Sequence, residues 1–530
     1  MWVSRLALRL RGTAVVRHNA LTDPGAEIPG TMLGPDVETN VLRHGSVSID
    51  LLRAMLWVSL CLSSVVQAAI DDRRWCETQT ARFTLVSDLK PERLQPIADD
   101  LLRFHAVAEL LVPQDTSKQL PPLTIFAFKS ARLLRSTFNV QSVSGLSLAS
   151  HDGFTLVYGP RYGKRSLSSM TAFHEYSHYL MLSRPVLKYP LWYGEGLASL
   201  LSTMEFPDLN TARVGIVPPV RLRNATRDYN LPLDQVVNRR HAMEPGGVDF
   251  LRVYERSWIL IHYLMYGHQA GFPNYATKID RILASIDTGA KGSEAIERAL
   301  GVSLEALEQD LIAYTLHRPT PTTVIEFTIS DAQTSSRCLS KNEARILLAN
   351  STANRNPDLA RKLLGKALLA DPSNADVLVG LSRVDAINAA AYSARAMALA
   401  PENPSVLIRK AELSMQSCQA EQPLTCQAIW RTAAGYYRAA LQRAPGRADA
   451  TLALGSLYLL MGDADLALPL LEKALTLAPW QTQIHLYLGQ AAAATGDVPR
   501  ARLHLDRAAN WHPELSGRQR ARSVLNRLPI

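Results

Sequence analysis

Short blocks of alternating apolar and polar residues mark the first third of the chain, and longer helical patterns follow them. Three blocks alternate as β-strands do: 82–87, 123–128 and 153–159. Residues 94–111 instead repeat their apolar positions with helical spacing, and residues 168–316 are mainly helical in pattern, with loops around 205–248. Strands that come first and helices that come after predict an α+β domain, which we assign to residues 69–316.

The pattern changes after residue 316. Residues 317–337 form a polar connector rich in Thr, Ser and Pro, and we place a domain boundary there. Beyond it the chain is rich in Ala and Leu, and several residues recur 34 positions apart. The recurring pairs are Leu454/Leu488, Gly455/Gly489, Gly462/Gly496, Ala467/Ala501, Ala474/Ala508 and Pro479/Pro513. This period resembles the tetratricopeptide repeat and predicts an all-α solenoid over residues 338–530, with an unrelated Ala-rich helical bundle as the alternative.

An apolar run near the start has a different character. Residues 55–66 are apolar or small, and Arg43 and Arg53 precede them. Val66-x-Ala68 matches the residue pattern of a signal-peptide cleavage site. The run is too short to span a bilayer comfortably. We therefore expect residues 1–68 to be an over-extended start plus a signal peptide, and the remaining chain to be exported, periplasmic or secreted, without a transmembrane anchor. A buried N-terminal helix is the alternative interpretation.

Composition and length fit a folded protein of two or three domains, at 530 residues, 47% hydrophobic and 20% charged. The net charge of +9 is spread without a dense Lys/Arg block, so we expect no nucleic-acid partner. Export would leave four cysteines, Cys76, Cys338, Cys418 and Cys426, an even number that an oxidising compartment can pair. Cys418 and Cys426 lie in one short insertion and are expected to pair with each other, although other pairings stay formally open.

The candidate chemistry begins with His174, Glu175 and His178. Their segment, 168–181, is predicted to be a helix with Ser168 or Ser169 as its N-cap. Histidines four residues apart project from one helical face, where both imidazoles can bind one metal ion. Glu175 is placed to reach a water on that metal. This is the His-Glu-x-x-His pattern of zinc hydrolases, although such a spacing also arises in helices that bind no metal.

A second helix is expected to supply a third ligand, Glu195. Pro185 ends the first helix, and after Pro190 comes Leu-Trp-Tyr-Gly-Glu-Gly-Leu-Ala-Ser. An antiparallel helix would bring Glu195 over the two histidines, and Gly194 and Gly196 would let it pack closely. Two imidazoles and a carboxylate leave the fourth position of one Zn²⁺ open to water. Glu195 as an ordinary surface acid is the alternative.

These two motifs, His174-Glu-x-x-His178 and Trp192-Tyr-Gly-Glu195-Gly-Leu-Ala198, resemble those of the gluzincins. Gluzincins are the peptidase-MA-like metallopeptidases typified by the aminopeptidase-N group. The resemblance extends from about residue 83 to residue 316. It implies a zincin-like catalytic domain that holds one zinc ion. The implied roles are metal ligand for His174, His178 and Glu195 and general base for Glu175.

The resemblance also places Tyr254 where such enzymes have a tyrosine that donates a hydrogen bond to the oxyanion. A packing role for Tyr254 is equally open, and His262 and His268 are weaker candidates for the same task. Two departures matter. Ser199 replaces the acid that orients one histidine in many gluzincins. The stretch 145–159 also lacks the Gly-x-Met-x-Asn motif that binds a substrate's free amine in the aminopeptidases.

The sequence thus predicts an exported zinc-dependent peptidase that hydrolyses peptide bonds with a metal-activated water and Glu175 as general base. By analogy with gluzincins, residues 153–158 would hold an extended peptide by edge pairing, and the repeats would recruit a protein substrate or partner. The alternative is a repeat-based protein-interaction adaptor whose zincin scaffold is weak or inactive in catalysis. Hydrolysis of a non-peptide amide is a third possibility.

Overall fold

The computed structural model describes most of the chain beyond residue 69. The described residues are 15–16, 70–112, 120–141, 144–150, 153–159, 165–183, 189–219, 221–223, 231–239, 250–317, 320–329, 333–418 and 423–529. Apart from residues 15–16, the expected over-extended start and signal peptide, residues 1–68, therefore lie outside them. Among the helices that are described, none combines the length and the apolarity that a membrane crossing requires.

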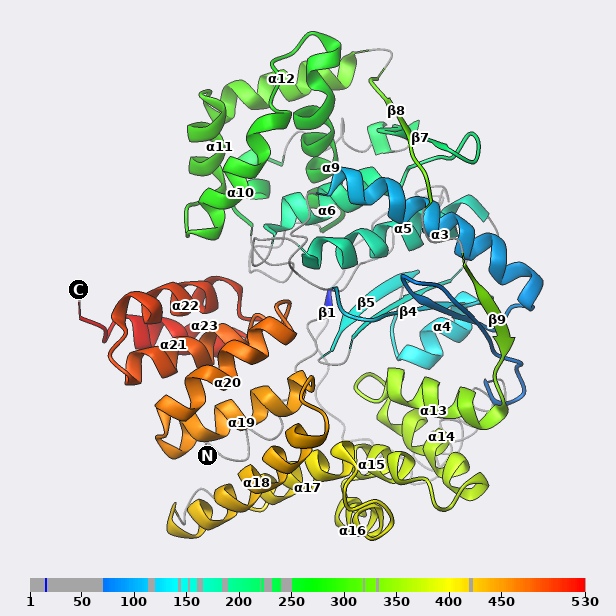
Figure 1. Ribbon diagram of the computed structural model, residues 1–530. Helices are drawn as coiled ribbons and strands as arrows, with labels where there is room; N and C mark the ends of the chain where they lie inside the picture. The colour runs from blue at the N-terminus through cyan, green and yellow to red at the C-terminus, as the bar shows by residue number, and fades with distance from the viewer. Residues whose placement is uncertain are drawn as a thin grey trace, which may run out of the picture.

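One mixed sheet forms the centre of the N-terminal domain (Figure 1). In the described chain its spatial order is β1 (Val15–Val16), β5 (Gly145–Ala149), β6 (Phe154–Tyr158), β4 (Leu123–Ala127), β3 (Thr84–Ser87), β2 (Cys76–Gln79) and β9 (Ser335–Cys338). The central strands β3, β4 and β6 run parallel, and the remaining neighbours pair antiparallel. A separate pair joins β7 (Thr211–Val214) to β8 (Thr323–Glu326).

The three central strands are those that alternation in the sequence predicts. One expectation about the sheet is wrong. Strand β6 has hydrogen-bonded neighbours on both sides, β5 and β4, so residues 153–158 cannot pair with an added peptide. The strand towards the edge is β5, which pairs only with the two residues of β1 on its outer side. The connector 317–337 also contains strand β8 and most of β9.

Alternation along the central strands gives the sheet two buried faces. Leu85, Ile125 and Leu156 belong to a core shared with α3 (Pro91–Leu111), α5 (Arg165–Leu180) and the later helices of the domain. Their immediate neighbours Val86, Phe126 and Val157 belong to a second core, built with α4 (Ala131–Phe138) and the first repeat helices. A sheet covered on both faces needs apolar residues at consecutive positions, as these strands have.

Helices on one side of the sheet carry the candidate chemistry. Besides α3, α4 and α5 the domain contains α6 (Leu191–Leu201), α8 (Leu233–Val237), α9 (Phe250–Tyr266), α10 (Ile279–Asp287), α11 (Gly292–Leu300) and α12 (Leu304–Leu316). Short 3₁₀ turns lie at η1 (Met181–Ser183), η2 (Gly267–Ala270) and η3 (Ala276–Lys278). Because α5 begins at Arg165, Ser168 and Ser169 lie inside it, and the predicted N-cap is wrong.

The C-terminal part is an all-helical solenoid of paired helices. In the part of this region that the structure describes, the pairs are α13 (Lys341–Thr352) with α14 (Pro357–Ala370), α15 (Ala375–Val384) with α16 (Ala389–Leu399), α17 (Pro404–Gln416) with α18 (Pro423–Arg443), α19 (Ala448–Met461) with α20 (Ala464–Leu477), and α21 (Ile484–Ala494) with α22 (Val498–Trp511), followed by α23 (Leu515–Leu525). Of the recurring glycines, Gly455 and Gly489 lie where helices touch, since an added Cβ would stand 3.0 Å from Leu471 and 2.5 Å from Leu505 respectively. Gly462 and Gly496 end their helices at φ 90° and 82°, a conformation that favours glycine.

Two disulfides are present. Cys418–Cys426 spans the connection between α17 and α18 and confirms the expected pair. Cys76–Cys338 joins β2 to β9, in which the two cysteines are register partners. The second bond therefore attaches the beginning of the solenoid to the sheet of the N-terminal domain.

The solenoid touches the N-terminal domain at both of its ends (Figure 1). At its start, α13 and α14 cover the second face of the sheet, and Asn356 donates a hydrogen bond of 3.0 Å to the carbonyl of Ser136. Near its end, Trp480 Nε1 donates to the carbonyl of Ser150 at 3.0 Å, directly after β5. Arg507 on α22 forms a salt bridge of 3.6 Å with Asp287 on α10. The helices thus form an arc that begins and ends on the same domain.

Candidate metal centre

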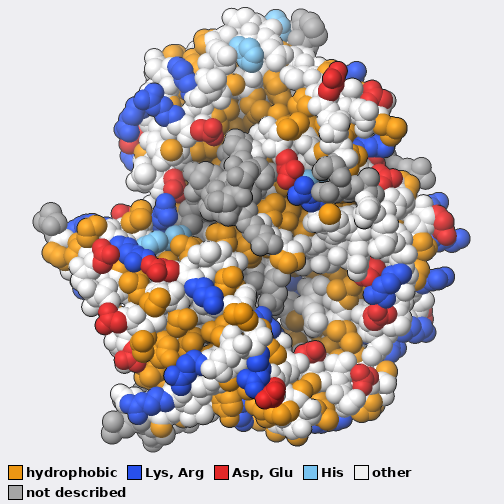
Figure 2. Space-filling view, viewed as in Figure 1, with side chains coloured by type: hydrophobic (Ala, Val, Ile, Leu, Met, Phe, Trp, Pro, Cys, Tyr) orange, Lys and Arg blue, Asp and Glu red, His pale blue; other side chains and the backbone are white. Residues whose placement is uncertain are grey.

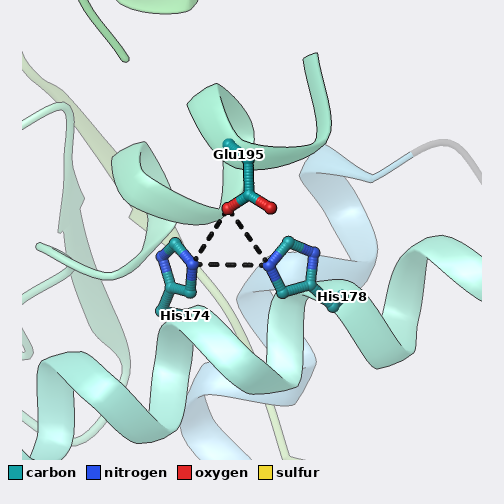
Figure 3. A group of neighbouring side chains, drawn as sticks. All are labelled: His174, His178 and Glu195. Carbon is teal, nitrogen blue, oxygen red and sulfur yellow. Dashed lines mark hydrogen bonds and ion pairs between the residues drawn. The ribbon is translucent and has the colours of Figure 1, made fainter. Parts of the chain in front are cut away.

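Two helices bring His174, His178 and Glu195 together (Figure 3). The Nε2 atoms of the histidines lie 3.3 Å apart, and Glu195 Oε2 lies 3.3 Å from His174 Nε2 and 3.5 Å from His178 Nε2. Figure 3 shows both imidazoles rising from α5 and the carboxylate pointing at them from the helix above. The sequence prediction that these three side chains converge is therefore met by the geometry.

The spacing of the three atoms fits a tetrahedral zinc site. Zinc–ligand bonds of about 2.0–2.1 Å at tetrahedral angles put neighbouring ligand atoms about 3.3 Å apart. The three observed distances of 3.3, 3.3 and 3.5 Å match that separation, and all three donor atoms face one point. Two imidazoles and one carboxylate also form a donor set that zinc prefers and that leaves one position open. The residues present therefore fit a zinc ion.

The close approach of α6 depends on one glycine. A Cβ at Gly196 would lie 2.5 Å from the backbone oxygen of Ser257 and 2.6 Å from the side chain of Ile261, both on α9. Gly194 has no such role, because the nearest atom to its added Cβ is Tyr189 Cβ at 3.8 Å. Of the two glycines singled out from the sequence, only Gly196 permits tight packing, and it fixes the position of Glu195 beside it.

Glu175 follows His174 on α5 and lies against strand β5. It is 1% exposed, and its carboxylate accepts a hydrogen bond from the hydroxyl of Ser147. A Cβ on Gly145 would stand 3.1 Å from Glu175 Cγ and 3.2 Å from Oε1, so this glycine leaves the space that the side chain occupies. Burial raises the pKa of Glu175 to about 8, with the charge of Glu195 adding to the shift. A carboxyl group with this pKa can both accept and return a proton near neutral pH.

Burial and neighbouring charges shift the pKa values of the two histidines in opposite directions. Burial lowers the pKa of His174, and the charge of the neighbouring His178 lowers it further. At His178 burial is outweighed by the carboxylates of Glu195 and Glu175, so its pKa is raised. Metal ligation requires both imidazoles to be neutral, and zinc binding would therefore release a proton from this pair when His178 is charged.

Tyr254 on α9 also reaches the cluster. Its ring centroid lies 6.3 Å from that of His174, and its hydroxyl donates a hydrogen bond to Glu195. Burial, together with the charges of Glu195 and Glu175, raises the pKa of Tyr254 well above its usual value. The hydroxyl therefore keeps its proton and remains a hydrogen-bond donor beside the ligands.

Other candidates lie elsewhere or do less. His262 is buried, with Nδ1 hydrogen-bonded to the hydroxyl of Tyr314 at 2.7 Å and Nε2 to the carbonyl of Gly215 at 2.9 Å. Both ring nitrogens are therefore used in hydrogen bonds within the fold. His268 is exposed in η2. Ser199 is buried, and its hydroxyl makes no hydrogen bond to any residue within the described ranges, so it does not replace the acid that orients a histidine in many gluzincins.

Gly145 and Ser147 are site residues that the sequence did not reveal. They lie two positions apart on one face of β5, while their neighbours Leu146 and Leu148 belong to the core on the other face. This alternation was a usable signal for a strand. Which helix that face would meet depends on the order of strands in the sheet, and no local pattern specifies that order.

Comparisons with known proteins bear on the C-terminal region. Residues 430–481 and 458–528 match models of the tetratricopeptide repeat, so the solenoid contains tetratricopeptide repeats, a module that binds proteins. One similar solved structure is a thermophilic TPR protein from Thermus thermophilus, 23% identical, covering 35% of this chain and 99% of that one with a TM-score of 0.30. Another is pilF of Pseudomonas aeruginosa, 23% identical, covering 34% of this chain and 87% of that one with a TM-score of 0.27. Yeast Tom70 is 13% identical and covers 68% of this chain and 81% of its own, with a TM-score of 0.28. No curated protein matches the chain.

Proposed function

We propose that the protein is a zinc-dependent peptidase of the gluzincin type whose repeats bind a protein substrate or partner. The observation that carries the proposal is the triangle of donor atoms, 3.3, 3.3 and 3.5 Å on a side. The buried carboxylate of Glu175 lies beside it, on the helix that carries the two histidines. The spacing supports zinc as the ion. The buried carboxylate supports hydrolysis, because a structural zinc site needs no adjacent base.

Each side chain has a definable task in such a reaction. Zinc bound to His174, His178 and Glu195 would supply a Lewis acid that polarises a carbonyl and lowers the pKa of water. Glu175, held by Ser147, would accept the proton of the attacking water and return it to the leaving amine. The Tyr254 hydroxyl would donate a hydrogen bond to the oxygen on which negative charge develops. Its present acceptor, Glu195, shows that the hydroxyl already points into the cluster.

The compartment of the protein is part of the proposal. The apolar run at residues 55–66 with its Val66-x-Ala68 site favours export, to the periplasm or beyond the cell. Two disulfides support the same assignment, because structural disulfides persist mainly in oxidising compartments.

A second candidate is a repeat-based adaptor with a catalytically weak N-terminal scaffold. The comparisons favour this candidate, because both family-model matches lie within the repeats. Ser199 in place of an orienting acid agrees with weak catalysis. On the face shown in Figure 2, Lys and Arg side chains are interspersed with Asp and Glu, which suits protein partners of mixed charge.

The two candidates differ in a simple experiment on the purified protein. Bound zinc is measured by mass spectrometry, and a mixed peptide library is incubated with wild type and with Glu175→Gln. We expect one zinc per chain, loss of zinc in His174→Ala, and cleavage by wild type that Glu175→Gln lowers at least about 10³-fold. Zinc without cleavage that depends on Glu175 would identify the adaptor. Absence of stoichiometric zinc, with no change in His174→Ala, would disprove the metal centre.

A further inference from the structure

A buried arginine lies next to the metal centre without a role in the scheme above. Arg221 is 7% exposed, and its Cζ lies over the ring of Trp258 on α9 at 5.9 Å from the centroid. Trp258 follows Tyr254 by one helical turn, so the two rings lie on the same side of α9. The Tyr254 ring is 6.3 Å from that of His174. These contacts place the guanidinium along the same wall as the zinc ligands.

The charge of Arg221 acts on His174 in the metal centre. It is one of the causes that lower the pKa of His174, after burial and the neighbouring His178. Burial also lowers the pKa of Arg221 itself, while the charge of Glu255 opposes that shift and favours the protonated guanidinium. The centre therefore has a fixed positive charge in addition to the one that a metal would bring.

Other buried arginines have partners, and Arg221 differs from them. Arg256 is fully buried and forms a salt bridge with Glu308. Arg409 is 2% exposed and pairs with Glu412 at 2.9 Å and with Ser382. No hydrogen bond or salt bridge joins Arg221 to any residue in the described ranges. A guanidinium offers five N–H donors, and those of Arg221 are available to an acceptor that lies outside these ranges.

The contact with Trp258 is a cation–π contact, in which the charge of the guanidinium lies over the ring, and the indole offers no acceptor atom for its N–H groups. Those donors can therefore serve another planar group. A carboxylate is the acceptor that matches these donors, because its two oxygens can take two parallel hydrogen bonds. Because the charge of Arg221 acts on His174, a ligand of the guanidinium would lie close to the metal centre, where the substrate of the proposed reaction must also lie.

We infer that Arg221 binds a carboxylate of the substrate and makes the centre selective for peptides that have a negative charge near the scissile bond. The inference rests on the proposed peptidase function for the identity of the ligand as a peptide. The carboxylate comes either from the C-terminus of the substrate or from an Asp or Glu side chain. Both sources offer the same chemistry to the guanidinium.

The test measures binding to zinc-loaded full-length protein carrying Glu175→Gln, which is not expected to consume its ligand. Two pairs of short acetylated peptides serve as probes in calorimetry. One pair differs only in a free or amidated C-terminus, and the other, amidated throughout, differs only in one internal Glu or Gln. We expect at least one charged peptide to bind about tenfold more tightly than its neutral counterpart, in line with a charge-assisted hydrogen-bond pair. The pair that shows the preference identifies the source of the carboxylate.

The same titrations are repeated with Arg221→Gln and Arg221→Lys added. Arg221→Gln should reduce the preference to less than about twofold, and Arg221→Lys should retain part of it, because lysine keeps the charge without the planar fork. Arg223→Gln is the matched control, since it removes an exposed positive charge two residues away and should leave the preference intact. Zinc content reports whether each variant folds, and Arg221→Lys carries the test if Arg221→Gln fails to do so.

The inference is overturned if neither charged peptide is preferred, or if the preference survives the loss of Arg221. Its failure is distinct from failure of the peptidase function. An Arg221-dependent preference without any cleavage by wild type supports the carboxylate site and rejects the peptidase. Cleavage by wild type with the same kcat/KM in Arg221→Gln, for charged and neutral peptides alike, rejects the carboxylate site alone.

Discussion

The two glycines that flank Glu195 have opposite expected responses to one added methyl group. Gly196→Ala would place a Cβ 2.5 Å from the backbone of Ser257, so α6 must move away from α9 and take Glu195 with it. We expect a loss of about 1–3 kcal/mol in unfolding free energy and at least tenfold weaker zinc binding. Gly194→Ala meets no atom closer than 3.8 Å and should stabilise the helix by up to about 1 kcal/mol with unchanged zinc affinity. Chelator competition and urea denaturation measure both quantities; equal behaviour of the two variants would contradict the packing argument.

The proposed role of the Tyr254 hydroxyl can be tested by removing that oxygen alone. In Tyr254→Phe we expect kcat to fall about 10²-fold while KM changes less than about threefold, because the hydrogen bond strengthens only as charge develops on the substrate oxygen. Zinc content should stay at one per chain. If Tyr254 only fills space, Tyr254→Phe will leave kcat near the wild-type value and Tyr254→Ala will lower the melting temperature. Peptide-cleavage kinetics with calorimetric melting of both variants separate these outcomes.

At the residue scale, the sequence revealed the site residues that belong to one motif. It missed those that are distant in sequence and meet the motif only in the folded structure. The spacing of His174 and His178 follows from helix geometry, and Glu195 lies in an apolar helix where a carboxylate needs a partner. Ser147 and Gly145 meet Glu175 because the strand order puts β5 beside α5. That order depends on non-local pairing, which no short window of sequence specifies.

The elements that were predicted are those with strong patterns of their own. Strands β3, β4 and β6 are apolar and central, and the repeat helices follow a period of 34 residues. Strand β9 was missed because its residues, Ser335–Cys338, are polar and mostly exposed at the end of the sheet. It forms a strand because β2 offers it hydrogen bonds and because Cys338 is bonded to Cys76.

At the scale of elements, we expect the helix pair α21–α22 to lose stability as the pH falls. His485 and His504 are buried with their Nδ1 atoms 2.7 Å apart, and burial lowers the pKa of His504 to about 4. The unfolded chain has an ordinary histidine pKa of about 6.5, so below that pH the unfolded state takes up the proton first. Stability should therefore be complete above pH 6.5 and decline as the pH falls from 6.5 to 4, by up to about 3 kcal/mol from this residue.

The measurement is urea denaturation of wild type and His504→Gln across this pH range, followed by circular dichroism. His504→Gln should flatten the decline, whereas the exposed His268→Gln should follow the wild-type curve. An identical pH dependence in wild type and His504→Gln would show that the buried pair does not control the stability of these repeats.

At the scale of the whole molecule, the two disulfides should contribute unequally. Cys76–Cys338 closes a loop with a sequence separation of 262, and Cys418–Cys426 one of 8. By loop entropy alone, these bonds stabilise the folded chain by about 5.5 and about 2.5 kcal/mol respectively. We expect the double variant Cys76→Ser/Cys338→Ser to lose about twice the unfolding free energy lost by Cys418→Ser/Cys426→Ser. Guanidinium denaturation under oxidising conditions checks the ratio, and a larger loss in the second variant would contradict it.

A solenoid that is attached at only one end can change its curvature at little cost in free energy. Here Trp480 is hydrogen-bonded to Ser150 and Arg507 forms a salt bridge with Asp287, so the far end is clasped to the domain on which the arc began. A partner that bends the repeats must strain or undo that clasp. Ser150 directly follows β5, the strand that presents Gly145 and Ser147 to Glu175. If the repeats bind a partner that changes their curvature, we therefore expect the strain to reach the strand that contacts Glu175, at a distance from the partner itself.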